Sequence, residues 1–237
     1  MIKNILFDLD GTLLPLDQEV FVEAYMRTLS RHLLPHGYDP KKLVGSIWTG
    51  TAAMVKNDGS KTNDLAFWDH FCGIFGPQAR EDEPKFDEYY RKKFPEVKVS
   101  CGFSPQAAPI VEGLKRKGYR LILATNPIFP AVATEQRIAW AGLKKEDFEL
   151  VTTYENSRFC KPNPAYYLEI FDKLGLKAEE CLMIGNDVTE DMVAKKLGCQ
   201  VFLLTEHLIN KDNADISAYP HGDFVDLEKF LQNIENR

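Results

Sequence analysis

The 237-residue sequence has little of what would indicate a secreted, membrane-bound or nucleic-acid-binding protein. Its five cysteines are scattered and form no Cys-x-x-Cys pair, so we expect reduced thiols and no cysteine-based metal framework. No run reaches the roughly 18 apolar residues of a membrane span, which predicts no membrane partner. Acidic residues outnumber basic ones by 35 to 29, and the absence of a basic patch predicts no nucleic-acid partner.

The beginning of the sequence also leaves no room for the apolar segment of a secretory signal, because an acidic pair occurs already at Asp8 and Asp10. We therefore expect a cytoplasmic protein. There is no internal repeat and no low-complexity tract. A hydrophobic content of 44% is ordinary for a globular protein and sufficient for a core, and the length allows one or two domains.

Residues 16–99 contain helical patterns and no convincing strand. Apolar residues at spacings of three and four predict a helix over residues 17–34, and a second helix is expected over 40–55. A third helix, capped by Asn63, carries a heavy aromatic face, and a fourth is expected over 84–94. Four consecutive helices predict a small helical bundle, whose core would hold the aromatic residues Trp48, Phe67, Trp68, Phe71 and Tyr89.

From residue 100 onward, short apolar runs alternate with helical patterns. Strands are predicted over 120–125, 148–152, 181–185 and 200–204, and helices over 104–118, 131–141, 163–175 and 189–197. This alternation predicts an α/β fold with a doubly wound, Rossmann-like parallel sheet that includes the first strand, residues 5–7. The predicted domains are an α/β core, residues 1–15 and 100–237, and an inserted α-helical cap, residues 16–99.

Polar residues follow the predicted strands at the edge where α/β sheets bind ligands. Asp8 and Asp10 lie one residue apart, so along an extended strand their side chains would project to the same side. Segments far apart in the sequence would bring further polar side chains to this edge: Thr125, Asn126, Lys161, Asn186, Asp187 and Asp191.

Several carboxylates at one sheet edge repel one another, and each pair at 4 Å costs roughly 4 kcal/mol at an effective dielectric constant near 20. A hard divalent cation relieves this repulsion, and Mg²⁺ suits a site of few carboxylates, water and a phosphate. Lys161 adds a positive charge suited to phosphate, and Thr125 and Asn126 can donate hydrogen bonds to it. An aspartate can also act as a nucleophile through an aspartyl-phosphate.

Four motifs in order resemble those of the haloacid dehalogenase (HAD) superfamily, specifically its phosphatases with a helical cap inserted after the first motif. The sequence DLDGT, residues 8–12, matches the first motif, Thr125 the second and Lys161 the third. The stretch from Gly185 to Asp191 matches the fourth. The resemblance covers essentially the whole chain.

The resemblance implies a role for each matching residue. Asp8 would attack phosphorus, and Asp10 would protonate the leaving oxygen and then activate water. Thr125 would bind the transferring phosphoryl group, and Lys161 would stabilise its charge and that of Asp8. The expected substrate- and phosphate-binding residues are Asn126, Leu9 and Lys161. The dehalogenases of the superfamily lack the second acid of the first motif, so Asp10 argues against a carbon–halogen substrate.

The fourth motif departs from the usual pattern because Asn186, rather than an acid, follows Gly185. The resemblance implies that Mg²⁺ is held by Asp8, the backbone carbonyl of Asp10 and an acid of this motif. We expect that acid to be Asp187, with Asn186 and Asp191 as alternatives or outer neighbours. Asp191 would then orient Lys161 or a metal-bound water.

The function expected from the sequence is a Mg²⁺-dependent hydrolase of a small phosphorylated metabolite, either a monomer or a homodimer. A phosphomutase of the same fold would use the same aspartyl-phosphate, and a non-catalytic sensor that binds a metabolite or partner is the alternative from another class. The insertion would close over the site, with Trp48, Thr49, Lys56 and Lys61 as candidate substrate contacts.

Overall fold

The computed structural model describes residues 1–235 and contains, within them, a six-stranded parallel sheet of order β3-β2-β1-β4-β5-β6. The α/β fold with a doubly wound sheet is confirmed. The central strands carry the longest pairings, and the two edge strands have only two residues each. The strands are β1 (Asn4–Phe7), β2 (Arg120–Leu123), β3 (Leu150–Val151), β4 (Cys181–Gly185), β5 (Gln200–Leu204) and β6 (His221–Gly222).

The central strands consist mainly of consecutive apolar residues, because both faces of the sheet are covered by helices. Ile5 and Phe7 of β1 belong to one buried hydrophobic cluster, and Leu6 between them belongs to the other. In the described chain, the first face is covered by α5 (Ala107–Arg116), α6 (Ala131–Trp140) and α8 (Phe224–Glu235). The second face is covered by α7 (Pro164–Leu174) and the 3₁₀ helix η6 (Met192–Leu197).

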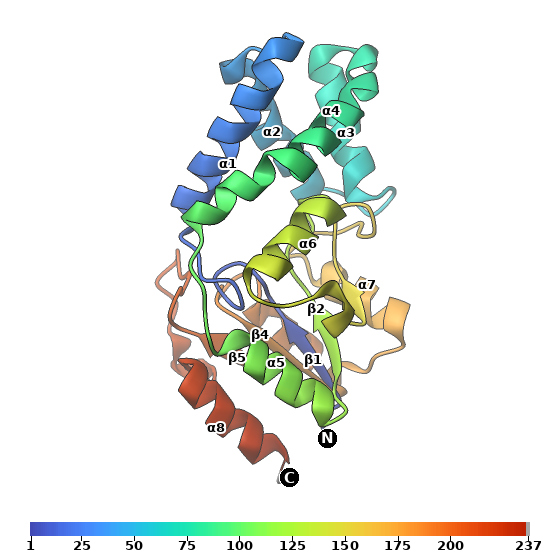
Figure 1. Cartoon of the computed structure of the whole chain (residues 1–237). Helices are drawn as coiled ribbons and strands as arrows, with labels where there is room; N and C mark the ends of the chain where they lie inside the picture. The colour runs from blue at the N-terminus through green and yellow to red at the C-terminus, as the bar shows by residue number, and fades with distance from the viewer. Residues whose placement is uncertain (236–237) are drawn as a thin grey trace.

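The helices between β1 and α5 lie together at one end of the molecule (Figure 1), and no strand occurs among the residues of this segment, as expected. The aromatic residues Phe67, Trp68, Phe71 and Tyr89 are buried there, as predicted, whereas Trp48 is 52% exposed. We call this segment, residues 16–99, the helical insertion. Its helices are α1 (Gln18–Leu33), α2 (Pro40–Val55), α3 (Asn63–Phe75) and α4 (Glu83–Lys92), with the 3₁₀ helices η1 (Leu34–His36), η2 (Pro77–Asp82) and η3 (Phe94–Ser100).

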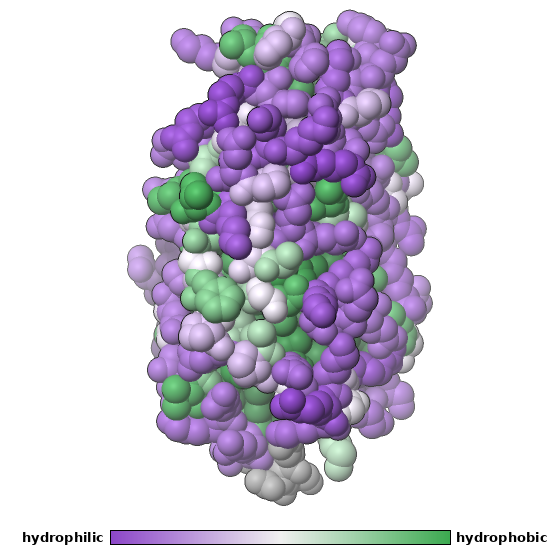
Figure 2. Space-filling model, viewed as in Figure 1, coloured by the Kyte–Doolittle hydropathy of each residue, from purple (hydrophilic) through white to green (hydrophobic). Residues whose placement is uncertain are grey.

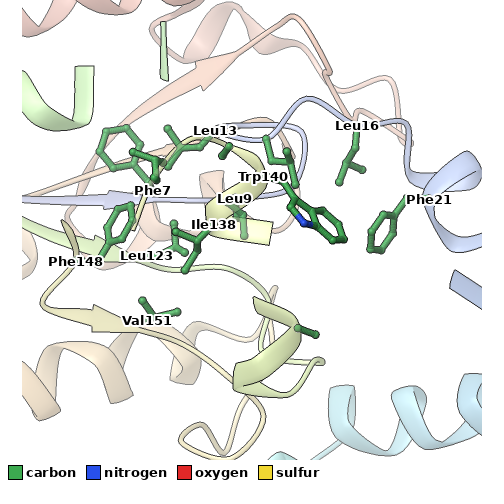
Figure 3. Packing of buried hydrophobic residues seen from close by; sticks show 14 of the residues in the cluster. Phe7, Leu9, Leu13, Leu16, Phe21, Leu123, Ile138, Trp140, Phe148 and Val151 are labelled. Carbon is green, nitrogen blue, oxygen red and sulfur yellow. The ribbon is translucent and has the colours of Figure 1, made fainter. Parts of the chain in front are cut away.

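One hydrophobic cluster continues from the sheet into the helical insertion. Figure 3 shows Phe7 and Leu123 of adjacent strands beside Ile138 of α6, with Trp140 between this group and Phe21 of α1. The side of the molecule in Figure 2 is mostly hydrophilic, with apolar residues gathered near its middle. Among residues 1–235, no helix has the length and apolar character needed to span a membrane.

The structure corrects four details of the sequence prediction. The helix expected over 189–197 is the shorter η6, closed by i→i+3 bonds such as Ala194 N to Asp191 O, 3.2 Å. Helix α3 is preceded by Thr62 as its N-cap residue, so Asn63 is not the cap. Strand β6 and helix α8 were not predicted. Short 3₁₀ turns also occur at η4 (Lys145–Asp147), η5 (Ala178–Glu180) and η7 (Ile216–Ala218).

Candidate active site

The polar residues at the strand ends meet in a cleft of about 520 Å³. This cleft lies at the carboxyl ends of β1 and β4, where the order of strands in the sheet reverses direction, the usual ligand position in such folds. The predicted site residues that line it are Asp8, Asp10, Thr125, Asn126, Asn186, Asp187 and Asp191. The sequence therefore located the cleft, because parallel strands bring their carboxyl ends to one edge.

A tight turn directly after β1 brings Asp8 and Asp10 to this edge. The backbone nitrogen of Asp8 donates to Ile184 O at 2.9 Å, so the first residue of the turn still pairs with β4. Gly11 has φ +82°, and a Cβ atom there would lie 2.3 Å from Asn186 Nδ2. Glycine is thus required at this position both for its backbone conformation and for the close approach of Asn186.

Lys161 is 1% exposed and forms two buried ion pairs at the base of the cleft. Its Nζ lies 2.8 Å from Asp8 Oδ1 and 2.6 Å from Asp191 Oδ1. Burial by itself lowers the pKa of Lys161, but the carboxylates of Asp191 and Asp8 raise it well above the usual value. The lysine is therefore a fixed cation whose charge does not fully balance the two surrounding carboxylates.

Asp10 is paired with a residue that the sequence reasoning missed. Arg137 of α6 is 1% exposed and donates through Nη1 to Asp10 Oδ2. Its guanidinium carbon also lies 4.5 Å from the ring centre of Phe129. Burial raises the pKa of Asp10, and the charge of Arg137 opposes this rise. Only tertiary packing shows this pair, because Arg137 lies 127 residues from Asp10 in a helix with an ordinary pattern.

Asn126 connects two other parts of the site. Its Oδ1 accepts from Lys161 N at 3.2 Å, and its Nδ2 donates to Glu190 Oε2 at 2.9 Å. Burial raises the pKa of Glu190, which the sequence reasoning also missed, to about 8. Thr125 beside it is buried, and its carbonyl oxygen accepts hydrogen bonds from Thr152 and Tyr166. Thr125 and Asn126 are thus held in place by the loop and helix that follow β3.

Asn186 and Asp187 of the fourth motif make different contacts. Thr12 Oγ1 lies 3.0 Å from Asn186 Oδ1 and 3.3 Å from Asp8 Oδ2, so the Asn186 amide adjoins the first motif. The Asp187 Oδ1 atom instead accepts from the backbone nitrogens of Thr189 and Glu190, at 2.7 and 2.9 Å. Asp187 therefore caps its own turn, whereas the side-chain oxygen of the alternative residue, Asn186, lies on the Thr12 hydroxyl that also contacts Asp8.

The remaining predicted contacts take different positions. The Leu9 side chain is fully buried in the hydrophobic cluster, so only its backbone is available to a phosphate (Figure 3). Thr49 Oγ1 donates to Gly45 O on its own helix, and Lys61 Nζ pairs with Asp69 at 2.7 Å. Lys56 is exposed. Trp48, the fourth residue of the insertion that was predicted to contact substrate, lines a cavity.

Asn63 joins the helical insertion to the loops that carry the site residues. It has no exposed surface, and its Nδ2 donates to Pro127 O at 3.1 Å and lies 3.3 Å from Cys160 Sγ. Its backbone nitrogen donates to Ser157 O at 2.8 Å. Pro127 follows Asn126, and Cys160 precedes Lys161, so Asn63 contacts both loops next to their candidate site residues.

Replacing Asn63 by alanine is expected to lower the free energy of unfolding by about 1–3 kcal/mol, because buried polar partners lose their hydrogen bonds. Urea denaturation monitored by circular dichroism measures this change. Asn210→Ala is the control, since the Asn210 side chain exchanges hydrogen bonds with Ala214 at the exposed surface, and its effect should be smaller. Equal losses for the two variants would contradict the structural role of Asn63.

The fold and the cleft together define an α/β protein with a carboxylate-lined candidate active site. A model of the haloacid dehalogenase-like hydrolases matches residues 2–198, and the chain belongs to this family. It is therefore an enzyme of the hydrolase class, and the resemblance drawn from the four motifs is confirmed.

Individual relatives are distant. The chain is 29% identical over 229 residues to a phosphoglycolate phosphatase of Yersinia pseudotuberculosis, covering 95% of this chain and 91% of the relative. A 2-haloacid dehalogenase structure from Pseudomonas syringae is similar with a TM-score of 0.67 at 19% identity, covering 98% and 99% of the two chains. A HAD family enzyme of Bacteroides thetaiotaomicron, in complex with magnesium and inorganic phosphate, has a TM-score of 0.50 at 19% identity, covering 92% and 98%. These structures show the fold alone.

Proposed function

We propose that this protein is a Mg²⁺-dependent phosphatase that hydrolyses a small phosphorylated metabolite through an aspartyl-phosphate on Asp8. The observation that carries the proposal is the buried Lys161, whose Nζ contacts both Asp8 and Asp191. A lysine held in this way orients the Asp8 carboxylate and presents a fixed positive charge to a phosphoryl group. The phosphatases among the distant relatives support the same reaction class.

The donor atoms around Asp8 fit a magnesium ion. Asp8 supplies a carboxylate, Asn186 an amide oxygen close to it, and Asp10 a backbone carbonyl, which are the hard oxygen ligands that Mg²⁺ prefers. Among residues 1–235 no three acidic, histidine or cysteine side chains form a ready metal cluster. We propose Asn186 for the fourth-motif position because Asp187 caps its own turn. When bound, Mg²⁺ would neutralise negative charge between the carboxylates and the phosphate.

In the first half of the proposed reaction, an oxygen of Asp8 attacks phosphorus and forms an O–P bond. The bond between phosphorus and the leaving oxygen breaks, and Asp10 donates its proton to that oxygen. Burial raises the pKa of Asp10, which favours the protonated form that this step requires. Thr125, Asn126 and Lys161 would bind the oxygens of the transferring group.

In the second half, Asp10 accepts a proton from water, the water oxygen bonds to phosphorus, and the Asp8–phosphorus bond breaks. This step requires the Asp10 carboxylate to remain in place after it has lost its proton. Arg137 would keep the Asp10 carboxylate in place, because it pairs with Asp10 and packs against Phe129 on the α6 side of the cleft. Inorganic phosphate and the restored Asp8 carboxylate are the products.

We also propose that residues 16–99 act as a cap domain over the core formed by residues 1–15 and 100–237. Val22 of α1 lines the same cleft as Asp8, so the insertion forms part of the wall of the site. Closure of such a segment would exclude water from the reacting phosphate.

The proposed function predicts turnover of phosphomonoesters that depends on Mg²⁺. Purified protein should release inorganic phosphate from p-nitrophenyl phosphate or a member of a broad phosphomonoester panel. Chelation of divalent metal should abolish the activity, and added Mg²⁺ should restore it. Release of phosphate that is unaffected by chelation would contradict the metal requirement. No turnover on any member of the panel with Mg²⁺ present would contradict the phosphatase proposal itself.

A further inference from the structure

A second cavity, of about 80 Å³, adjoins the catalytic cleft between the helical insertion and the loops that follow β2 and β3. The two spaces share a wall, because Val22, Ile128 and Phe129 line both of them. Phe129 also packs against Arg137, the partner of Asp10. We call this second space the apolar cavity; it adjoins the cleft that contains Asp8 across Val22, Ile128 and Phe129.

The lining of the apolar cavity is aromatic and aliphatic, and in the described part of the chain it includes no charged side chain. Its polar groups are neutral, such as the hydroxyls of Thr51 and of the tyrosines. Tyr25 and Tyr90 hydrogen-bond to each other at 2.8 Å, and burial raises the pKa of Tyr25 to about 12. These groups can accompany an uncharged ligand, but they cannot neutralise an anionic one.

The charges around the neighbouring cleft are mostly negative. Besides the motif acids, Asp17, Glu19 and Glu190 line it, and Lys211 is the one lysine or arginine among its described lining residues. Lys161 is already engaged by two carboxylates. A second anionic group on the substrate, placed beyond Phe129, would meet no cation in the cavity lining. Arg137, which packs against Phe129, is already paired with Asp10, so burial of that anionic group would be unfavourable.

We propose that the apolar cavity binds the leaving group of the substrate, and that this group is an uncharged aryl or branched alkyl alcohol. The inference rests on the proposed phosphatase function and adds the substrate class. The proposed substrate class differs from phosphoglycolate, the substrate in the name of several relatives, because no lysine or arginine of the cavity lining could pair with its carboxylate. Small phosphorylated carboxylates are consequently poor substrates.

The test compares benzyl phosphate with phosphoglycolate, with Mg²⁺ present, by phosphate release. Both are phosphate esters of primary alcohols, so their leaving oxygens are similar. A difference in kcat/KM therefore reports mainly the group that would enter the cavity. We expect kcat/KM for benzyl phosphate to exceed that for phosphoglycolate by about tenfold or more, since apolar burial favours one and desolvation disfavours the other.

Thr51→Lys introduces a cation into the cavity wall. We expect it to shift the ratio of the two kcat/KM values toward phosphoglycolate by about tenfold or more. Thr49→Lys is the matched control, because Thr49 lies on the same helix, is exposed and does not line the cavity. Trp48→Ala is a second variant at a half-exposed position of the cavity lining, and it should lower kcat/KM for benzyl phosphate by a larger factor than kcat/KM for phosphoglycolate.

The outcomes distinguish the inference from the function on which it rests. Mg²⁺-dependent turnover in which phosphoglycolate equals or exceeds benzyl phosphate would overturn the inference and leave the phosphatase function standing. Equal effects of Thr51→Lys and Thr49→Lys on the ratio would likewise overturn it. An absence of turnover across the whole phosphomonoester panel would overturn the phosphatase function, and the inference with it.

Discussion

Asp8→Asn is expected to reduce phosphomonoester turnover by roughly 10⁴-fold or more, because removal of a nucleophile eliminates the covalent step. The substitution is nearly isosteric, and Lys161 keeps its second partner, Asp191, at 2.6 Å. The fold should therefore persist. Steady-state phosphate release measures the loss, and near-ultraviolet circular dichroism checks that the variant is folded. Rapid acid quenching of the unmodified enzyme should additionally show a protein-bound phosphoryl group that is absent from the variant.

Asp187→Asn is the matched control for the loss of a carboxylate at the same sheet edge. An asparagine Oδ1 can accept the hydrogen bonds from Thr189 and Glu190 that the Asp187 side chain accepts in the structure. We expect turnover and the Mg²⁺ concentration for half-maximal activity to change little. A large increase in that concentration would instead identify Asp187 as the metal ligand and contradict the assignment to Asn186. Turnover by Asp8→Asn within tenfold of the unmodified enzyme would contradict nucleophilic catalysis.

Lys161→Met is expected to lower the free energy of unfolding by about 3–5 kcal/mol, because it leaves two buried carboxylates without their cation. Methionine approximates the length of the lysine stem, so the loss reports mainly the missing charge. Urea denaturation of the metal-free protein measures it. Adding Asp191→Leu should recover part of the lost stability, since one of the unpaired carboxylates is then removed.

Lys3→Met provides the comparison at the surface. Lys3 pairs with Glu180 at 2.6 Å, but its side chain is 60% exposed, so solvent replaces the lost partner and the effect should be small. Similar effects of Lys161→Met and Lys3→Met would show that the buried ion pairs are not essential to the fold. Failure of Asp191→Leu to recover any stability would show that Asp191 and Lys161 are not coupled.

The positions of several helices and strands were predictable from the sequence. The helix over residues 40–55 has the predicted bounds, and the strand ending at Gly185 is also where the sequence placed it. Both have strong apolar patterns with proline or glycine at a boundary. Strand β6 was not predicted, because two residues form no apolar run that could distinguish a strand from a loop. Helix α8 was also not predicted, although Phe224, Leu227 and Leu231 have the spacing of an apolar helix face.

Within the site, residues at strand ends were easier to predict than residues on helices. Thr125 and Asn126 follow a buried strand, and their position at the cleft follows from that alone. Arg137 and Glu190 have no such signal. A buried arginine in a helix resembles an exposed one in sequence, and only the packing of α6 against the first motif shows its contact with Asp10.

The sequence by itself determined the family, the doubly wound sheet and the cleft toward which Asp8 and Asp10 project, because parallel strands necessarily gather their carboxyl ends. The tertiary structure alone decided the direction of each side chain at that edge. Asn186 and Asp187 are adjacent in the chain, yet one adjoins Asp8 through Thr12 and the other caps a turn. The tertiary structure also determined where the apolar cavity next to Phe129 forms, because its walls come from segments more than 100 residues apart. Such arrangements depend on how separate elements pack, which no local pattern encodes.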